Sequence, residues 1–272
     1  MKPPIAPPSP RGEATPYVLI IAGSDPSGGA GLQSDIKTAL ESGCESGAVA
    51  TALTVQTGRG VRRVHSVSSR AVAEQLAALY EDVRPDAIKI GMIASAAVAR
   101  AVAPWLEKWR NSGVPIVVDP ICVSSSGHAL LDEKGRAALT SRLFPLASVV
   151  TPNEGELLAL MGKSDAQSAA EAFCVRYGAA LVITGGEGEG ARAVDYLITK
   201  GRCVSYAFPR VPNGENVRGT GCMFSCALAS ALAKGEGIDD AVFSAKRYVF
   251  RAVAGSRPCG EGRPVGGRLS LL

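Results

Sequence analysis

The sequence contains no uncharged apolar run of about 20 residues, the length that a helix needs to cross a membrane. Aromatic residues are scarce, at 5% of the 272 residues, and the densest basic segment, GRGVRRVHS at 58–66, has none between its arginines. That segment lacks the stacking rings that accompany positive charge in nucleic-acid-binding sites, and we interpret it as a solvated loop. We expect neither a membrane nor a nucleic acid among the partners of this protein.

Histidine and closely spaced cysteines are missing as well. The chain has two histidines and seven dispersed cysteines, with no C-x-x-C pair among them. A zinc site needs more such ligands at closer spacing, so the pattern argues against one. An odd number of scattered cysteines instead favours reduced thiols, and we expect a cytoplasmic protein.

The first sixteen residues, MKPPIAPPSPRGEATP, contain six prolines and no continuous apolar run. This composition predicts a disordered extension, residues 1–16, rather than a signal peptide. Residues 17–256 contain no linker or internal repeat, and we expect residues 17–272 to form one domain with a substantial core.

Short apolar runs alternate with amphipathic or alanine-rich segments along most of the chain. The runs predict buried strands at 17–23, 87–91, 115–119, 148–153 and 180–186. The other segments predict helices at 29–42, 69–82, 95–110, 132–143, 153–162, 165–177, 220–234 and 238–254, and a β-hairpin at 194–211. This order is typical of an α/β fold with a mostly parallel sheet and helices on both faces, in which ligands bind at the carboxyl ends of the strands.

The first predicted strand ends in a loop, residues 23–35, with four glycines within nine positions. Such a loop lets backbone N–H groups approach an anion closely, so we predict a ligand-binding loop there. Its glycines do not have the G-x-G-x-x-G spacing, and MGKS at 161–164 has Leu157 where a Walker motif has its first glycine. Any nucleotide phosphate must therefore be bound by a different motif.

Carboxylate and amide side chains follow two later predicted strands. Asp119 ends the strand at 115–119, and Asn153 and Glu156 lie three residues apart at a helix start. Side chains at that spacing share a helix face, and together with Asp119 they suit a hydrated Mg²⁺ that also binds phosphates. Taken alone, Glu156 is better explained as an ordinary first-turn acid that the helix dipole favours.

The segment Gly219-Thr220-Gly221-Cys222 leads directly into a predicted helix. The backbone N–H groups at such a helix start have no intrahelical partner and form a nest for an oxyanion. The same field lowers the pKa of a thiol, which makes Cys222 a candidate proton acceptor. The alternative is that Cys222 is a small buried side chain, like Cys226 one turn further along.

Eight segments, in order, resemble the signatures of one family, the hydroxymethylpyrimidine/phosphomethylpyrimidine kinases of thiamine biosynthesis. They are IAGSDPSGGAGLQSDIKT (21–38), TALTVQT (51–57), KIGM (89–92), VVDP (117–120), SGHALL (126–131), TPNEGE (151–156), TGG (184–186) and GTGC (219–222). The resemblance implies a ribokinase-like fold, with a three-layer arrangement of helices about a mostly parallel sheet, and ATP and Mg²⁺ as the groups that it binds.

The resemblance also implies roles for single residues on the substrate side. Gln56 matches the glutamine that recognises the edge of the pyrimidine ring, and Met92 matches a methionine that lines the same pocket. Asp25, with Gly23 in the same loop, would lie against the hydroxymethyl group of the substrate.

Further roles are implied on the ATP side. Asn153 and Glu156 match a motif that organises Mg²⁺ and phosphates, with Asp119 holding the metal through water. The loop at 219–222 would form the anion hole for the transferring phosphoryl group, and Cys222 stands where related kinases have a general base.

The chain departs from the family pattern near the expected phosphates. Thr184 occupies the position of a lysine, and Glu187 that of a histidine, although Thr184 and Gly186 remain in the segment expected to bind ATP. Ser125 stands at another position where a lysine is frequent. In exchange, Arg218 precedes the anion-hole loop, and its guanidinium suits phosphate oxygens, so we expect it to supply the lost charge.

We therefore predict ATP-dependent phosphorylation of 4-amino-5-hydroxymethyl-2-methylpyrimidine, and of its monophosphate to the diphosphate. The alternatives are a pyridoxal-type vitamin kinase of the same fold and a non-catalytic sensor of pyrimidine or nucleotide. The family resemblance also implies a homodimer.

Overall fold

The computed structural model describes residues 15–123, 127, 130–186 and 190–267. Most of the predicted N-terminal extension, residues 1–14, lies outside this part, as do Ser125 and Glu187. The described strands are β1 (Tyr17–Ser24), β2 (Glu45–Thr57), β3 (Gly60–Ser66), β4 (Ala87–Ile90), β5 (Ile116–Val118), β6 (Val149–Val150), β7 (Ala180–Ile183), β8 (Arg192–Thr199) and β9 (Arg202–Pro209).

The helices occur at the places that the sequence predicts. They are α1 (Gly31–Glu41), α2 (Ser69–Asp82), α3 (Ala96–Asn111), α4 (Glu133–Ala138), α5 (Glu154–Met161), α6 (Ala166–Tyr177), α7 (Thr220–Ala233) and α8 (Ile238–Ala254). A π-helical turn, η1 (Leu139–Leu143), prolongs α4, and two 3₁₀ turns follow later, η2 (Phe144–Leu146) and η3 (Gly214–Asn216).

All nine strands belong to one sheet, in the order β3-β2-β1-β4-β5-β6-β7-β8-β9. Strands β2, β1, β4, β5, β6 and β7 run parallel. Strand β3 pairs antiparallel with β2, and β8 pairs antiparallel with both β7 and β9. The predicted mostly parallel sheet is confirmed, and the carboxyl ends of its parallel strands meet along one edge.

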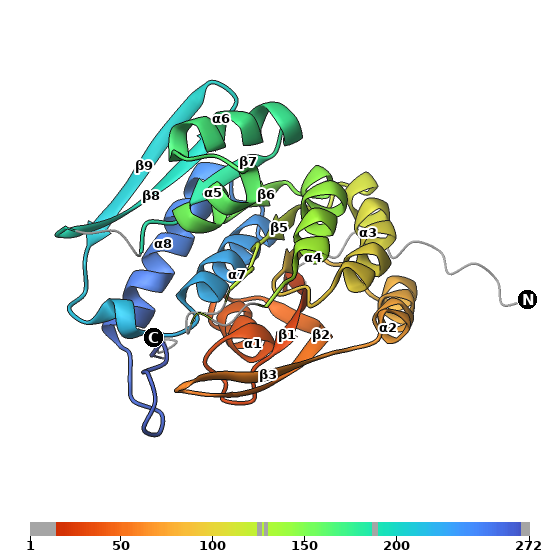
Figure 1. The fold of residues 1–272 in the computed structure, drawn as a ribbon, viewed down its shortest axis with the longest axis horizontal. Helices are drawn as coiled ribbons and strands as arrows, with labels where there is room; N and C mark the ends of the chain where they lie inside the picture. Colours follow the sequence, from red (N-terminus) through yellow and green to blue (C-terminus); the bar gives the residue numbers. More distant parts are fainter. Residues whose placement is uncertain (1–14, 124–126, 128–129, 187–189, 268–272) are drawn as a thin grey trace, which may run out of the picture.

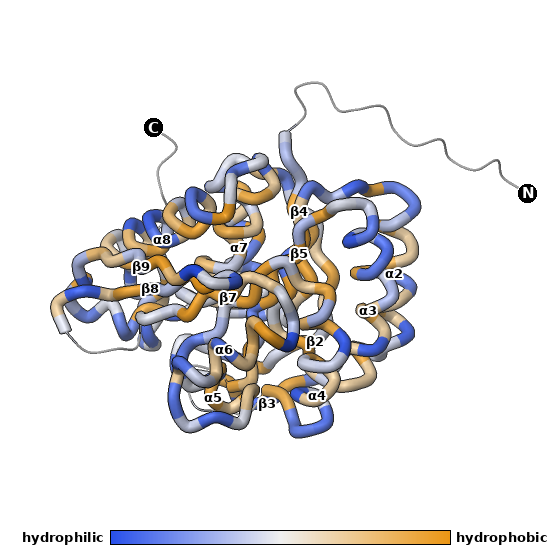
Figure 2. Tube along the Cα trace, turned by 90° about the horizontal axis from the view of Figure 1, so that it is seen from above, coloured by the Kyte–Doolittle hydropathy of each residue, from blue (hydrophilic) through white to orange (hydrophobic). Residues whose placement is uncertain are grey.

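Helices cover both faces of the sheet (Figure 1). Alternate residues of β1 show the two layers: Leu19 and Ile21 belong to one buried cluster, and Val18 and Ile20 to the other. The first cluster packs under α2, α3, α4, α5 and α6, and the second under α1, α7 and α8. Apolar residues are concentrated in the central strands and polar residues on the outer surfaces of α2 and α3 (Figure 2). A strand buried on both faces therefore forms a nearly continuous apolar run, which β4 interrupts at Lys89.

Local sequence explains where several helices begin and end. The side chains of Ser68, Asp132 and Asp165 accept hydrogen bonds from the first turns of α2, α4 and α6. Gly162 and Gly178 end α5 and α6 in the left-handed conformation, which glycine adopts without steric cost. MGKS at 161–164 is thus the end of a helix, as its failure to match a Walker motif indicates.

Residues 45–66 are the part of the fold that the sequence analysis missed. The segment interpreted as a solvated loop is largely strand β3, the edge partner of β2. Arg62 and Arg63 are exposed on it, and charged side chains on an edge strand oppose pairing with a further chain. Because β3 is half exposed and β2 is rich in small residues, neither has the continuous apolar run that identified the central strands.

The described residues contain no helix that is both long and apolar enough to span a membrane. All seven cysteines are free thiols, two of them exposed, Cys203 and Cys259.

The aromatic cluster under α6 offers a test of the packing. Phe173 is 1% exposed and its ring meets those of Phe144 and Tyr177, so Phe173→Ala should lower the free energy of unfolding by about 3–5 kcal/mol. Val175 lies on the same helix but is 90% exposed, so Val175→Ala should change it by less than about 0.5 kcal/mol. Urea titration followed by circular dichroism measures both, and equal losses would contradict this packing.

Candidate active site

One pocket of about 680 Å³ lies where the parallel strands end. Residues that follow β1, β4, β5, β6 and β7 line it, together with the start of α7 and one face of α8. It brings together every residue that the sequence analysis assigned to the site: Gly23, Asp25, Gln56, Met92, Asp119, Asn153, Glu156, Thr184, Gly186, Arg218, Gly219, Thr220, Gly221 and Cys222.

A buried ion pair joins the two loops at one end of this pocket. A guanidinium nitrogen of Arg218 lies 2.7 Å from Asp25 Oδ2, and both side chains are 3% exposed. A second nitrogen of Arg218 donates to the hydroxyl of Ser27 at 2.9 Å. The amide of Gln56 also donates to Asp25 Oδ2, at 3.3 Å. Asp25 thus connects the glycine loop after β1, the end of β2 and the loop before α7, and the charge of Arg218 is balanced by this carboxylate.

Close packing explains two of the glycines at this end. A Cβ on Gly23 would lie 3.0 Å from the sulfur of Met92, so the absence of a side chain makes room for the methionine in the pocket wall. Gly219 has a positive φ of 75°, and a Cβ there would lie 2.1 Å from the carbonyl oxygen of Gly29. Only glycine allows the two loops to approach so closely.

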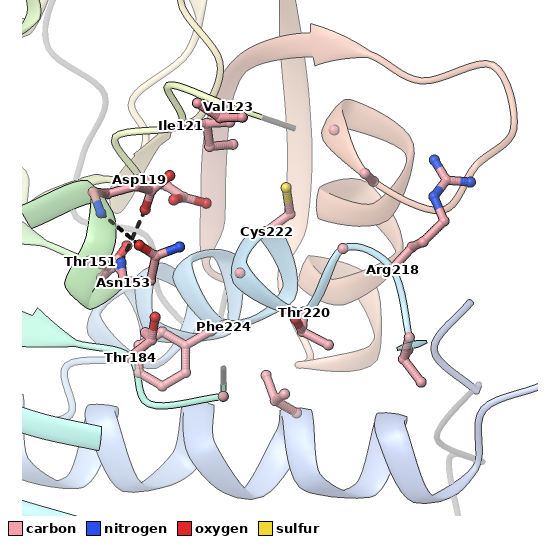
Figure 3. Close-up of a pocket in the computed structure, with 18 of the residues that line it drawn as sticks. Asp119, Ile121, Val123, Thr151, Asn153, Thr184, Arg218, Thr220, Cys222 and Phe224 are labelled. Atoms are coloured by element: carbon pink, nitrogen blue, oxygen red, sulfur yellow. Dashed lines mark hydrogen bonds between the residues drawn. The ribbon is translucent and has the colours of Figure 1, made fainter. Parts of the chain in front are cut away.

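The start of α7 faces the middle of the pocket. Gly219 is the N-cap and brings no side-chain hydrogen bond, and the first backbone bond back to it comes from the N–H of Met223. The N–H groups of Thr220, Gly221 and Cys222 belong to the first turn of the helix, where no intrahelical partner exists. Figure 3 shows the sulfur of Cys222 directed into the pocket from this turn.

The predicted effect of the helix start on Cys222 is wrong for the ligand-free protein. Burial raises the pKa of its thiol to about 12, because a thiolate loses its hydration there. The nearby ammonium of Lys89 and a hydrogen bond from the Gly31 backbone lower this pKa, but by less than burial raises it. Cys222 is therefore buried, and its sulfur is also directed into the pocket. It has features of both alternatives that the sequence left open, a small buried side chain and a candidate proton acceptor.

A fully buried charge cluster lies beneath Cys222. Lys89 on β4 pairs with Asp35 on α1, with 2.7 Å between Nζ and Oδ2 and no exposure of either side chain. Burial alone would lower the pKa of Lys89, but the charge of Asp35 and further acidic groups outweigh it and raise that pKa. A Cβ on Gly91 would lie 2.9 Å from this ammonium, so that glycine leaves it room. The pair was not predicted from the sequence, although a lysine inside the apolar run AIKIG is a signal for it.

Asp119 lines the pocket beside this cluster. Its Oδ2 accepts a hydrogen bond from the hydroxyl of Ser225 at 3.0 Å, and burial raises its pKa. Asn153 and Glu156 form a capping box at the start of α5: Asn153 Oδ1 accepts from the Glu156 N–H at 2.8 Å, and Glu156 Oε2 accepts from the Asn153 N–H at 3.0 Å. Glu156 thus has the local helical role that was one alternative for it, and it also lines the pocket.

No group of three or more histidine, cysteine, aspartate or glutamate side chains in the described residues could hold a metal by itself. Among the acidic side chains that line the pocket, Asp25 and Asp195 are each paired with a buried cation, and Asp119 and Glu156 are two further carboxylates. Such a set fits Mg²⁺, which keeps several waters and is typically bound by one or two carboxylates together with substrate phosphates.

The remaining end of the pocket lies between the hairpin β8–β9 and α8. Thr184 reaches it from β7, where its N–H donates to the Pro152 carbonyl at 2.9 Å. Apolar side chains line this end: Phe208, Val211, Val249, Phe250 and Val253. A buried pair, Lys246 and Asp195, lies there as well. These residues were not predicted from the sequence, although a lysine on the apolar face of the last helix is a signal for a buried charge.

A family model described as phosphomethylpyrimidine kinase matches residues 25–265 of this chain. The match contains all the predicted site residues except Gly23.

Two curated proteins are similar in sequence. The thiamine biosynthesis bifunctional protein ThiED of Geobacter sulfurreducens is 40% identical over 260 residues, which cover 94% of this chain and 52% of that protein, so the chain spans about half of that relative. The hydroxymethylpyrimidine/phosphomethylpyrimidine kinase of Rhizobium meliloti is 39% identical over 257 residues, which cover 92% of this chain and 95% of that protein.

The fold also resembles a solved structure with a bound nucleotide. The crystal structure of an ADP complex of Bacillus subtilis pyridoxal kinase matches with a TM-score of 0.85 and 28% sequence identity, over 94% of this chain and 98% of that chain. This chain is thus similar to its relatives in sequence and to this structure in the arrangement of strands and helices.

The raised pKa of Cys222 predicts slow alkylation of the ligand-free protein. At pH 8 iodoacetamide should modify Cys222 at least about 100-fold more slowly than the exposed Cys203 and Cys259, because the thiolate is the nucleophile and this thiol stays protonated and buried. Between pH 7 and 10 its rate should rise about tenfold per unit without a plateau, as expected below a pKa. Peptide mass spectrometry measures each site. Early modification of Cys222, or a plateau below pH 9, would contradict the raised pKa.

Proposed function

The chain belongs to the phosphomethylpyrimidine kinase family, and on that premise we propose that it phosphorylates 4-amino-5-hydroxymethyl-2-methylpyrimidine with ATP in thiamine biosynthesis. The same site would convert the monophosphate to the diphosphate. The observation that carries the proposal is the shared pocket, in which a hydrogen-bonding end and an apolar end meet at the amide-rich start of α7.

The end around Asp25 suits the pyrimidine. Gln56 offers both a donor and an acceptor to a ring edge that carries an amino group and ring nitrogens. Met92 supplies an apolar surface for the ring, and Gly23 at the end of β1 and Asp25 in the loop that follows border the position of the hydroxymethyl group. This arrangement supports a small heteroaromatic alcohol as the acceptor.

The start of α7 suits the phosphoryl group that is transferred. Phosphoryl transfer needs the attacking and leaving oxygens in line and donors for the negative charge on the transferred group. The first-turn N–H groups of Thr220, Gly221 and Cys222, and the positive end of the helix dipole, supply such donors without reorganisation. Arg218 borders the same loop, and its guanidinium has further N–H groups for a phosphate oxygen beyond those held by Asp25 and Ser27.

Cys222 is the group that we propose for the proton of the substrate hydroxyl. The new O–P bond forms while the bond to the leaving ADP oxygen breaks. The hydroxyl proton passes to the sulfur of Cys222, either onto a thiolate or, when the thiol is protonated, as the S–H proton leaves to an oxygen of the transferred phosphoryl group. The ammonium of Lys89 lowers the pKa of this thiol and so favours the thiolate, although burial raises the same pKa by more in the ligand-free protein.

Asp119 and Glu156 are the residues that would hold Mg²⁺, through water and together with the phosphates of ATP, and the bound ion would neutralise charge on those phosphates. Asn153 keeps the carboxylate of Glu156 at the start of α5 through the capping box. Thr184 and Gly186 border the nucleotide from the end of β7.

Three further proposals concern the whole chain. Residues 17–272 form one domain, which the single nine-stranded sheet supports. The protein acts in the cytoplasm, which its seven free thiols support. It forms a homodimer, as the family resemblance implies, and the exposed Leu53 and Val55 on β2 are apolar side chains suited to such a contact.

ADP release from MgATP tests the activity with two acceptors, the pyrimidine and pyridoxal. We expect release that depends on the pyrimidine, and a fall in kcat of about 100-fold or more in Cys222→Ala, because removing a group that handles the proton costs about that much. Cys226→Ala is the matched control: Cys226 lies one turn along α7, is fully buried and does not line the pocket, so its kcat should stay within about threefold of wild type.

Pyridoxal-dependent release in place of pyrimidine-dependent release would favour the pyridoxal kinase alternative. Tight pyrimidine binding without ADP release in the presence of either acceptor would favour the alternative of a non-catalytic sensor. Equal turnover by Cys222→Ala and wild type would contradict the role given to the thiol.

A further inference from the structure

One face of α8 borders the pocket with a single cation followed by apolar side chains. Lys246, Val249, Phe250 and Val253 all line the pocket, and their spacing of three, four and seven residues places them on the same face of the helix. The ring of Phe250 lies 5.5 Å from that of Phe208 on β9, which lines the pocket as well. The face thus offers a positive charge at one end and an apolar surface along the next two turns.

The charge of Lys246 is held by a carboxylate that also fixes the turn after β7. Lys246 Nζ lies 2.7 Å from Asp195 Oδ1, with side-chain exposures of 8% and 3%. The same Asp195 oxygen accepts a hydrogen bond from the Gly185 N–H at 2.9 Å. The ammonium, the carboxylate and the Thr184–Gly186 turn are therefore connected at one corner of the pocket.

The ammonium of Lys246 has donors left for a ligand. An ammonium carries three N–H groups, and in the described part of the chain its one hydrogen-bonding or ion-pair partner is Asp195. Lys246 is among the residues whose atoms border the open space of the pocket. Its remaining N–H groups are thus available to an oxygen that enters there.

A contribution to folding stability alone does not explain well why Lys246 and Asp195 form a buried ion pair. Taking two charges out of water costs free energy, and apolar side chains of similar size are frequently as stable or more stable at such positions. The other two buried cations that line the pocket, Lys89 and Arg218, have partners on α1 and on the glycine loop. Lys246 is the buried cation beside the Thr184–Gly186 turn. Thr184 itself is uncharged, although it occupies the position of a lysine in the family pattern.

We propose that Lys246 binds a phosphate of the nucleotide, and that Asp195 is a positioning residue that holds Lys246 and the Gly185 turn together. The base of the same nucleotide lies along Val249, Phe250 and Val253, so the cation and the apolar face of α8 set the direction in which the nucleotide lies. This inference rests on the proposed function in one respect, namely that the pocket binds ATP. It adds the residue that supplies charge where Thr184 lacks it.

Binding of MgADP and of adenosine, measured by calorimetry on the full chain, tests the proposal. Lys246→Met should weaken MgADP binding by about 10- to 100-fold, the usual loss for a charged hydrogen bond, and leave adenosine binding within about threefold. Lys246→Arg keeps the charge and should retain most of the MgADP affinity. Pyrimidine binding should stay unchanged in all variants, because the ring lies at the other end of the pocket.

Two additional variants separate this role from a structural one. Asp195→Asn/Lys246→Met removes both charges, leaves no unpaired buried ion and should lose MgADP affinity as Lys246→Met does, so it decides the question if the single variant does not fold. Arg202→Met breaks the exposed pair between Arg202 and Asp239, which also joins β9 to α8 but lies away from the pocket. It should leave both affinities unchanged.

Unchanged MgADP affinity in the folded Lys246 variants would overturn the proposal. Equal losses for MgADP and adenosine would also overturn it, because they would show that the pair only supports the shape of the pocket. Wild-type protein that binds MgADP but releases none from MgATP with the pyrimidine would contradict the proposed function and leave this test intact. Wild-type protein that binds no MgADP would overturn both.

Discussion

The buried pair between Arg218 and Asp25 is the interaction on which the shape of the pocket depends. It joins residues 193 positions apart in the sequence, at the two loops that bring the acceptor end and the phosphoryl end together. Gln56 from β2 hydrogen-bonds to the same carboxylate, and Gly219 passes so close to Gly29 that no side chain would fit between the loops. Breaking such a pair leaves one charge buried without a partner, which is strongly destabilising. The proposed acceptor site is therefore assembled by the same contact that sets the start of α7.

Two more buried pairs bring cations to the pocket wall: Lys89, held by Asp35, and Lys246, held by Asp195. Each joins a strand of the sheet to a helix that packs against it: β4 to α1, and β8 to α8. A pocket for triply or quadruply charged ATP benefits from positive side chains that are already fixed in place, since no entropy is then lost in ordering them. The carboxylates hold these cations and also limit the net charge of the empty site.

The sequence predicted the central sheet because its strands are buried on both faces and are therefore mostly apolar, as in the runs at 17–23 and 180–186. It did not predict the hairpin at 45–66, whose outer strand is half exposed and charged. The family resemblance identified residues from seven separate segments that the fold brings into one pocket. Composition could not show how deeply Cys222 is buried, and its pKa depends on that burial more than on the helix start. Lys89 and Lys246 were missed because their partners, Asp35 and Asp195, are distant in sequence and only tertiary contacts reveal them.

The proposed reaction of this pocket is the transfer of a phosphoryl group from ATP to the hydroxymethyl oxygen of a pyrimidine. Phosphorus NMR of the products tests it most directly, with the full chain, MgATP and 4-amino-5-hydroxymethyl-2-methylpyrimidine. We expect a new phosphate-ester resonance, split by the adjacent methylene protons, that grows together with ADP and is absent when the pyrimidine is left out. ADP that appears with inorganic phosphate and no ester, or a spectrum of ATP that does not change, would contradict it.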